Sequence, residues 1–442
     1  MRETLPRVAM RLSVAMLLAT GMWLYVQLVL IPYQKTQGPM RQSPRGNLSD
    51  LYPRWLGTRE LLLHRRDPYS AEITREIQVG YYGRLLDSSR PGDPTDQQGF
   101  AYPVYVVLLL APTIKLPFVI VREVFFWFLG MLTAGAVLLW LKVLRWRPSR
   151  SAIMMWVLLT LSCFPAIQGL KLQQLSLMVA ALIAAFLWAL SRQRFVLAGI
   201  LLALATIKPQ LVFLIVLWLF IWVLGNWRGR QRVVWSFAVS MAVLVGIGEI
   251  LLPGWIGEFR LAIKDYYRYT GGGNSVLDVL LSPIGGKVTA AALVAMLVGL
   301  AWRYRNAEQE STAFQWSVCF TFATTLLVIP MFAPYNQLLL VPGLMMAIRA
   351  KGQLWERSRV SQFFCAFTAI SILWPFLAGF CLVVALAFLP GTTVQKAWGL
   401  PFYPTFAIPI AIYAILLVAR KVFVRERDPN EVTANEPARL AT

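Results

Sequence analysis

Long apolar runs separated by short polar or basic stretches recur along almost the whole chain. A helix that crosses a membrane needs about 20 mostly apolar residues, because its backbone must satisfy its own hydrogen bonds in hydrocarbon. The pattern predicts an all-α polytopic membrane protein, in which residues 1–442 form a single integral membrane domain with about twelve transmembrane helices. The expected crossings are 12–32, 118–141, 151–167, 173–190, 195–206, 209–225, 233–252, 284–302, 312–331, 335–348, 361–389 and 403–424.

A polar stretch at 33–101 follows the first crossing and is too long for a tight connection. It carries many charges of both signs, so we expect it to lie outside the bilayer. Within it, the sequence LYPRWLGTRELLLHRR places apolar residues at helical spacing on and around one stripe, with arginines elsewhere. The stripe residues are Leu51, Trp55, Leu56, Leu61, Leu62 and Leu63. We predict a short interfacial helix here, lying on the membrane surface.

The next apolar run, 102–117, is short and is interrupted near its end by Pro112, Lys115 and Pro117. Such a run barely crosses a bilayer, and we predict that it dips into the membrane and returns. The transmembrane bundle is expected within 102–424, followed by a polar tail.

Basic residues gather in the short loops, and this tests the expected crossings because each crossing alternates the side of the next loop. With a cytoplasmic amino terminus, every short basic cluster falls on the cytoplasmic side, as the positive-inside rule requires. The clusters are Arg2, Arg7 and Arg11; Lys142, Arg145, Arg147 and Arg150; Arg192 and Arg194; Arg228, Arg230 and Arg232; Arg303 and Arg305; Arg349, Lys351, Arg357 and Arg359; and Arg420, Lys421, Arg425 and Arg427. We therefore expect a multi-pass protein of a bacterial-type inner (cytoplasmic) membrane, with 425–442 as a cytoplasmic tail and 33–101 on the periplasmic or extracellular side.

The composition supports this class and disfavours others. Hydrophobic residues make up 58% of the chain and charged residues 14%, against roughly a quarter charged in soluble proteins. The formal charge of +21 fits the orientation of the short loops, so no nucleic-acid partner is expected. Four cysteines without CxxC spacing and a single histidine indicate neither a disulfide framework nor a metal site. No cleavage pattern follows the first apolar run, which we interpret as a retained helix.

Asp50 lies just after the first membrane helix and before the predicted interfacial helix. A carboxylate there is placed to reach a lipid-borne substrate at the water boundary, which makes Asp50 the strongest candidate for chemistry. Serine and aspartate also cap helix starts by accepting hydrogen bonds from free amides, so a cap at Ser49-Asp50 is the alternative. Asp67-Pro68-Tyr69 is interpreted as a turn that ends the interfacial helix, because the residue before proline avoids the helical region. Contact with substrate is the alternative there.

Lys208 interrupts an otherwise apolar stretch, 195–225, where an ammonium group is costly unless it is paired or faces water. Lysine binds phosphate as a point charge, so we interpret Lys208 as a phosphate ligand, with snorkelling at a helix end as the alternative. Gln174 and Ser176, beside Gln173, offer amide and hydroxyl groups suited to sugar hydroxyls. Hydrogen bonding between helices explains them equally well.

Two further polar segments are expected on the outer face. The loop 253–283 combines basic and aromatic residues, Arg260 among them, which suits lipid head groups or an aromatic belt at the interface. Its GGGNS sequence at 271–275 looks like a phosphate-binding loop but lacks the ending and the preceding strand of a P-loop. The Tyr-Asn-Gln segment at 335–337 breaks a helix after two prolines, either as a structural break or as a substrate contact.

The order of several motifs resembles that of a known family. The motifs are Asp50 after the first helix, AspProTyr at 67–69, PheAlaTyrPro at 100–103, GlnGlnLeuSer at 173–176, AlaGly then IleLysPro at 198–209, and AsnSer at 274–275. In order and spacing, over roughly residues 10–420, the chain resembles glycosyltransferase family 87. That family belongs to the GT-C superfamily and includes mycobacterial mannosyltransferases that use polyprenyl-phosphate mannose.

The resemblance implies a GT-C fold and an inverting membrane glycosyltransferase. Such an enzyme moves a sugar, mannose in those members, from a polyprenyl-phosphate carrier to a hydroxyl of a lipid or glycan acceptor on the outer face. Asp50 matches the family's catalytic aspartate and takes the acceptor's proton, while Lys208 and Arg260 support the leaving phosphate. The implied sugar or acceptor contacts are Gln174, Ser176, Tyr335, Asn336, Gln337, Tyr102 and Asn274, with Asp67 and Tyr69 as supporting residues. No metal or cofactor is expected, and membrane lipids are the remaining partners.

Two other functions are alternatives. A transporter or flippase of lipid-linked glycans is expected to carry charges deep in several helices, whereas the charges here collect at one face. A polymerase or ligase of lipid-linked glycans uses lipid diphosphate donors, for which a richer arginine cluster in the outer loops is expected.

Overall fold

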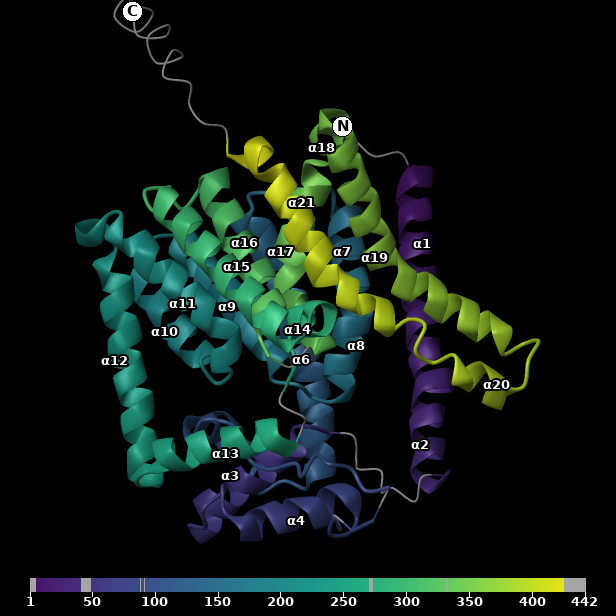
Figure 1. Ribbon diagram of the computed structural model, residues 1–442, viewed down its shortest axis with the longest axis vertical. Helices are drawn as coiled ribbons and strands as arrows, with labels where there is room; N and C mark the ends of the chain where they lie inside the picture. The colour runs from purple at the N-terminus through teal and green to yellow at the C-terminus, as the bar shows by residue number, and fades with distance from the viewer. Residues whose placement is uncertain are drawn as a thin grey trace, which may run out of the picture.

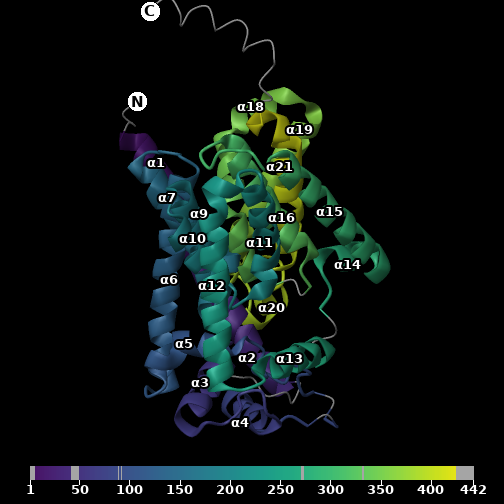
Figure 2. The same ribbon diagram turned by 90° about the vertical axis from the view of Figure 1, so that its left-hand side faces the viewer.

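Helices form every element of regular structure over the residues described by the computed structural model, 5–40, 49–87, 89–90, 92–269, 273–330 and 333–424 (Figures 1 and 2). A bundle of upright helices stands on a smaller layer of short helices. The predicted all-α class is confirmed. The expected tail 425–442 and the first two glycines of the 271–275 motif lie outside the described residues.

Six helices are long and apolar enough to cross a membrane, and a seventh span results if α7 (Arg150–Ser162) and α8 (Phe164–Lys171), bent by 55°, count as one. The six are α1 (Leu5–Tyr25) with η1 (Val26–Leu30) and α2 (Ile31–Met40), α6 (Phe118–Val143), α12 (Trp227–Leu251), α15 (Pro283–Arg303), α19 (Arg359–Ala385), and η5 (Tyr403–Phe406) with α21 (Ala407–Phe423). The chain is therefore a multi-pass membrane protein.

The remaining apolar helices are shorter. They are α9 (Ser176–Ser191), α10 (Phe195–Ala205), α11 (Pro209–Leu224), α16 (Thr312–Val328), and η4 (Pro334–Leu340) with α17 (Val341–Arg349). The 11 residues of α10 rise about 1.5 Å each and so span roughly half of the hydrocarbon core. The predicted number of about twelve crossings is not confirmed, because several expected crossings are short helices that meet at breaks.

The first helix is longer than the predicted 12–32, since helical structure continues from Leu5 to Met40. A five-residue π-helical turn, η1, ends two positions before Pro32. Proline lacks an N–H group and its ring clashes with the carbonyl four residues earlier, and a wider turn relieves that clash. Helical structure therefore continues over residues 33–40, the first part of the expected polar stretch.

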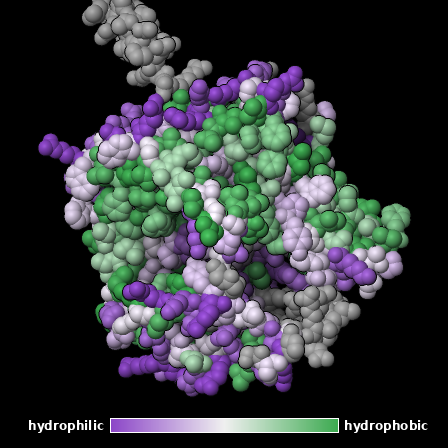
Figure 3. All heavy atoms as spheres, in the orientation of Figure 1, coloured by the Kyte–Doolittle hydropathy of each residue, from purple (hydrophilic) through white to green (hydrophobic). Residues whose placement is uncertain are grey.

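Basic side chains join the helix ends at the end of the bundle that carries the start of α1. The contacts are Arg145 with the Glu310 carboxylate, Arg230 with the Arg305 carbonyl (2.7 Å), Arg349 with the Leu144 carbonyl (2.8 Å) and Arg420 with the Tyr304 hydroxyl (2.9 Å). These contacts gather the basic turns at one end, as the predicted alternation requires. Figure 3 shows an apolar belt between this hydrophilic end and the hydrophilic layer at the other.

The opposite end carries the layer of short helices. Its elements are α3 (Tyr52–His64), α4 (Ala71–Tyr82), α13 (Trp255–Tyr269), and the short turns η2 (Val104–Val106), α5 (Val107–Leu110) and η3 (Ala111–Thr113) (Figure 1). The segment 102–117 folds into these three short turns before α6 begins at Phe118, and it is too short to be counted among the candidate spans. The remaining short helices are α14 (Val276–Leu281), α18 (Lys351–Arg357) and α20 (Gly391–Lys396).

α3 is the expected helix of the polar connection, but its apolar stripe packs on protein. Leu51 and Trp55 are 1% and 4% exposed. Trp55 Nε1 donates to the Thr113 carbonyl (3.3 Å), and its ring lies 5.2 Å from that of Phe118. Most of the stripe therefore joins α3 to the bundle, whereas Leu63 at its end is 42% exposed. The position of α3 on the membrane surface stays a prediction.

Gly57 allows α3 to approach the loop that leads into the site. A Cβ at this position would lie 2.5 Å from the Phe100 ring and 3.1 Å from Pro68. Gly57→Ala should lower the free energy of unfolding by about 1–3 kcal/mol through overpacking, measured as a lower melting temperature in detergent. Gly135→Ala on α6, with open space around its Cβ, is the control and should leave the melting temperature unchanged or slightly higher. Equal melting temperatures for the two variants would contradict the packing described here.

Candidate active site

A cavity of about 390 Å³ lies between the layer of short helices and the bundle. Its walls come from the start of α3, the loop 96–103, the breaks before α9, α11 and η4, and one side of α13. Helices therefore begin or break on several sides of one space, and this arrangement brings polar side chains from distant parts of the sequence together.

Asp50 reaches the cavity from the start of α3. Its backbone N–H donates to the Leu172 carbonyl (2.9 Å), which ties α3 to the break between α8 and α9. The Asp50 carboxylate accepts a hydrogen bond from Gln174 Nε2. No side chain caps the start of α3, so the structure does not support a capping role, and the Asp50 side chain lines the cavity.

A chain of hydrogen bonds connects Asp50 to three other breaks. Lys208 Nζ donates to Gln174 Oε1 (2.8 Å) and to Ser176 Oγ (2.7 Å). Ser176 Oγ in turn donates to Asn336 Oδ1 (2.8 Å). Gln174 thus bridges the Asp50 carboxylate and the Lys208 ammonium. The predicted polar residues of four separate segments form one network.

Lys208 is 6% exposed and lies directly before α11. The aromatic faces of Tyr335 and Tyr102 lie 5.1 and 5.7 Å from its ammonium nitrogen, a favourable but weak environment for a cation. Among the residues that the structure describes, no carboxylate forms an ion pair with it. Since Lys208 lines the cavity, the snorkelling alternative does not describe its position.

Arg54 is a second cation at the cavity, and the sequence analysis did not single it out. It follows Asp50 by four residues, Nη1 donates to the Asp50 carbonyl (2.5 Å), and its guanidinium lies 4.7 Å from the Tyr102 ring centre. The buried Nε has no hydrogen-bond partner within the described part of the chain. The four-residue spacing from Asp50 was the available signal, because residues four apart share one side of a helix.

A second carboxylate, Asp96, also lines the cavity. Burial raises the pKa of Asp96 above its usual value, an effect that the hydrogen bond from the Gln98 backbone N–H (2.9 Å) partly offsets. Burial likewise raises the pKa of the Tyr102 hydroxyl to about 12. α13 closes this side of the cavity with apolar and aromatic residues such as Phe259 and Tyr266.

The predicted supporting residues hold the loop that carries Tyr102. The Asp67 carboxylate accepts a hydrogen bond from the Tyr69 N–H (2.9 Å), as expected for a turn, and the Tyr69 hydroxyl donates to the Tyr102 carbonyl (2.6 Å). Tyr69 also packs edge-on against Phe100, with ring centres 5.2 Å apart. These residues therefore position the wall of the cavity without lining it.

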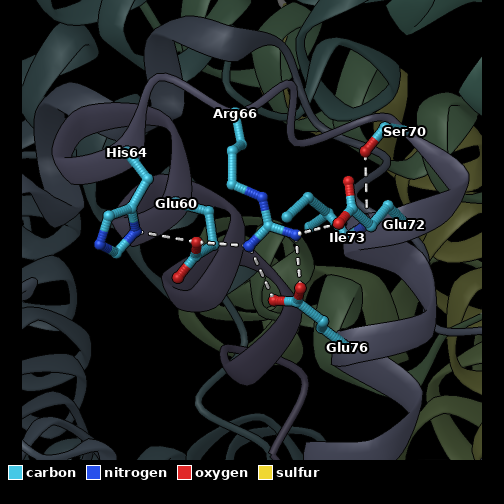
Figure 4. Close-up of polar contacts among 7 residues, drawn as sticks. All are labelled: Glu60, His64, Arg66, Ser70, Glu72, Ile73 and Glu76. Atoms are coloured by element: carbon cyan, nitrogen blue, oxygen red, sulfur yellow. Dashed lines mark hydrogen bonds and ion pairs between the residues drawn. The ribbon is translucent and has the colours of Figure 1, made fainter.

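Arg66 joins α3 to α4 beside the site, as Figure 4 shows. Its guanidinium pairs with Glu60 on α3 (2.8 Å) and with Glu72 (3.0 Å) and Glu76 on α4. Glu60 also contacts His64 (2.9 Å). The cluster joins the carboxyl-terminal end of α3 to the first half of α4.

Three other residues expected at the site lie apart from the cavity. Gln337 donates from Nε2 to the Thr405 carbonyl (2.9 Å) and is 4% exposed, so it joins η4 to η5. Arg260 and Asn274 are exposed, and neither is among the residues that line the cavity.

The arrangement suits an anionic ligand next to a polar partner. Two cations, two carboxyl groups and several amides face one space. Within the described ranges, no group of three or more His, Cys, Asp or Glu side chains is arranged to hold a metal ion.

Comparison with family models matches residues 100–330 to glycosyltransferase family 87, just over half of the 442 residues. The matched range is narrower than the extent over which the motifs resemble the family, and it includes Lys208 but not Asp50. Comparison with curated proteins and with solved structures gave no significant match. The family match supports glycosyltransferase activity, and the chain belongs to glycosyltransferase family 87.

Proposed function

We propose that this protein transfers a sugar from a polyprenyl-phosphate carrier to a hydroxyl of a lipid or glycan acceptor, with inversion, and that Asp50 is the general base. One observation carries the proposal. Lys208 and Arg54, two cations without a carboxylate partner among the described residues, face the same cavity as Asp50. This combination suits a substrate whose anionic group stays near the cations while a neutral hydroxyl reacts near the carboxylate.

The donor phosphate is assigned to Lys208 and Arg54. Lysine meets phosphate as a point charge, and the arginine fork donates two parallel hydrogen bonds. α9 and α11 both begin at the cavity, and helix amino termini carry a partial positive charge that favours anions. Arg260, which the family resemblance offered for this role, is exposed on α13, so Arg54 takes its place in the proposal.

The reaction is a single displacement at the anomeric carbon. The acceptor hydroxyl gives its proton to the Asp50 carboxylate while its oxygen bonds to the anomeric carbon. The bond from that carbon to the phosphate oxygen breaks, and the bonding electrons leave with the phosphate. Negative charge grows on the phosphate in the transition state, and preorganised cations stabilise charge that develops there. Gln174 holds the carboxylate in place through its Nε2.

The sugar is assigned to the space between the phosphate cations and Asp50. Gln174 and Asn336 offer amide groups there, and Tyr102 and Tyr335 offer aromatic faces. Mannose is the sugar that the family resemblance suggests. The positive-inside rule supports a cytoplasmic position for the basic end of the bundle and an outer-face position for the cavity.

Replacing Asp50 with asparagine removes the base but keeps an acceptor for the Gln174 bond. Asp50→Asn should lower the transfer rate by about 10²–10⁴-fold, the usual contribution of a general base. Transfer is measured with purified protein, a panel of polyprenyl-phosphate sugars and a membrane extract as acceptor, followed by mass analysis of the product. Asp96→Asn is the matched control, since it removes the other cavity carboxylate, and it should stay within about tenfold of wild type. A stronger loss in Asp96→Asn than in Asp50→Asn would refute Asp50 as the base.

Removal of either proposed phosphate cation should weaken the donor. Lys208→Gln and Arg54→Gln should each raise the dissociation constant of the donor lipid by about 10–100-fold, because hydrogen bonds to charged groups contribute about 1.5–3 kcal/mol. The dissociation constant of the acceptor should change much less. Arg260→Gln is the control and should change donor binding by less than about twofold, as expected for an exposed cation. Equal weakening of donor and acceptor would remove the phosphate assignment.

A buried ammonium without a counter-ion costs stability until an anion binds. Lys208→Met should therefore have a melting temperature equal to or above that of wild type in detergent without donor. Added donor lipid should raise the melting temperature of the wild type and leave that of the variant unchanged. A fall of several degrees in the unliganded variant would instead show that Lys208 is a structural residue.

A further inference from the structure

A second polar cavity, of about 690 Å³, lies at the end of the bundle opposite the candidate active site. The ends of α15, α18 and α21 and the start of α19 surround it. The residues that line it and are used below are Tyr304, Arg357, Ser358, Leu417, Arg420 and Lys421. We name this cavity the basic-end pocket.

Among the described residues that line the basic-end pocket, three are cations and none is a carboxylate. Arg357 donates from Nη1 to the Val418 carbonyl (2.9 Å), and Arg420 donates from Nε to the Tyr304 hydroxyl (2.9 Å). A guanidinium has five N–H donors, so each arginine keeps donors for a ligand while one hydrogen bond fixes its position. Lys421 is exposed beside them. The pocket therefore brings three positively charged side chains together, and hydrogen bonds hold two of them in position.

Apolar side chains continue from the pocket along the bundle surface. Leu417 on α21 and Val360 on α19 are 40% and 58% exposed. Trp302 at the end of α15 and Trp355 on α18 are 51% and 53% exposed. Tryptophan is enriched at the level of lipid head groups, so this combination places cations and indole rings at the height where head groups meet acyl chains.

We propose that the basic-end pocket binds the phosphodiester head group of an anionic phospholipid. Arg420 and Lys421 contact the phosphate, while the acyl chains lie along the exposed apolar side chains of α19 and α21. Basic pockets between membrane helices have the chemistry that anionic head groups require. The Tyr304 hydroxyl holds Arg420 in position and does not compete as an anion.

This site is separate from the proposed donor site. Phe402, just before η5, lines the active-site cavity, whereas Lys421 lines the basic-end pocket. Residues 407–420 of α21 lie between them and rise about 1.5 Å each, which places the two residues roughly 20 Å or more apart. One lipid head group cannot occupy both sites, and the proposal does not depend on the sugar-transfer reaction.

The test counts lipids bound to full-length protein by native mass spectrometry in detergent. The probes are dioleoylphosphatidylglycerol, which is anionic, and dioleoylphosphatidylcholine, which is zwitterionic with the same acyl chains. Wild type should bind the anionic lipid at least tenfold more tightly, and Arg420→Gln combined with Lys421→Gln should lose most of that preference. Lys142→Gln combined with Arg192→Gln removes the same charge from exposed residues at the same end and should keep it.

Melting temperature and size-exclusion profile establish that each variant is folded. Lys421→Gln alone breaks no described hydrogen bond, and it should show a smaller loss of the preference for the anionic lipid. A preference that survives in the Arg420/Lys421 variant would overturn the proposal. So would an equal loss in the Lys142/Arg192 control, which would show an effect of net charge alone. Inorganic phosphate is the third probe, and displacement of the lipid by millimolar phosphate would overturn the lipid assignment in favour of a soluble phosphate ligand.

Discussion

The buried ammonium of Lys208 is the constraint on which the site depends. In an apolar bundle a cation must find polar partners, and Lys208 finds Gln174 and Ser176, which lead to Asp50 and Asn336. Each partner lies where a helix begins or breaks. A break exposes backbone groups that hydrocarbon cannot satisfy, so the breaks gather around one polar cavity. The short helices α9 and α11 begin at this network and α10 ends just before it, because the network lies between the two ends of the bundle.

Much of the network was predictable because polar residues are conspicuous in an apolar chain. Lys208, Gln174 and Asn336 each interrupt an apolar run, and the basic turns predicted which breaks share a side. The structure brings these residues together around the cavity. For Asp50 the signal in the sequence is a different one, namely its position between a long membrane helix and a predicted short helix. Whether it acts as a base rests on the proposed chemistry.

Other features required tertiary packing and could not be predicted from the sequence. α3 has arginines on several sides, and only the contacts of Trp55 with Thr113 and Phe118 decide which side remains for the cavity, leaving Arg54 there. Asp96 lies in a turn-rich stretch where a carboxylate is unremarkable. The predicted number of crossings is not confirmed for a related reason, because hydropathy identifies apolar segments but does not tell how deep a segment reaches before it turns.

The proposed transfer also explains why two cations accompany one reactive carboxylate. Before reaction, ionised Asp50 and a phosphodiester carry two negative charges beside the two cations Lys208 and Arg54. Burial raises the pKa of Asp96, the other carboxyl group of the cavity. As the acceptor's proton reaches Asp50 and the phosphate leaves, one negative charge moves from the carboxylate to the phosphate, and the sum in the cavity stays the same. Charge interactions are strong where the dielectric constant is low. A step that moves an existing negative charge toward the two cations therefore avoids the free-energy cost of creating a new charge in the cavity. The same cations interact more strongly with the leaving phosphate than with the bound donor, and such differential binding is what accelerates a reaction.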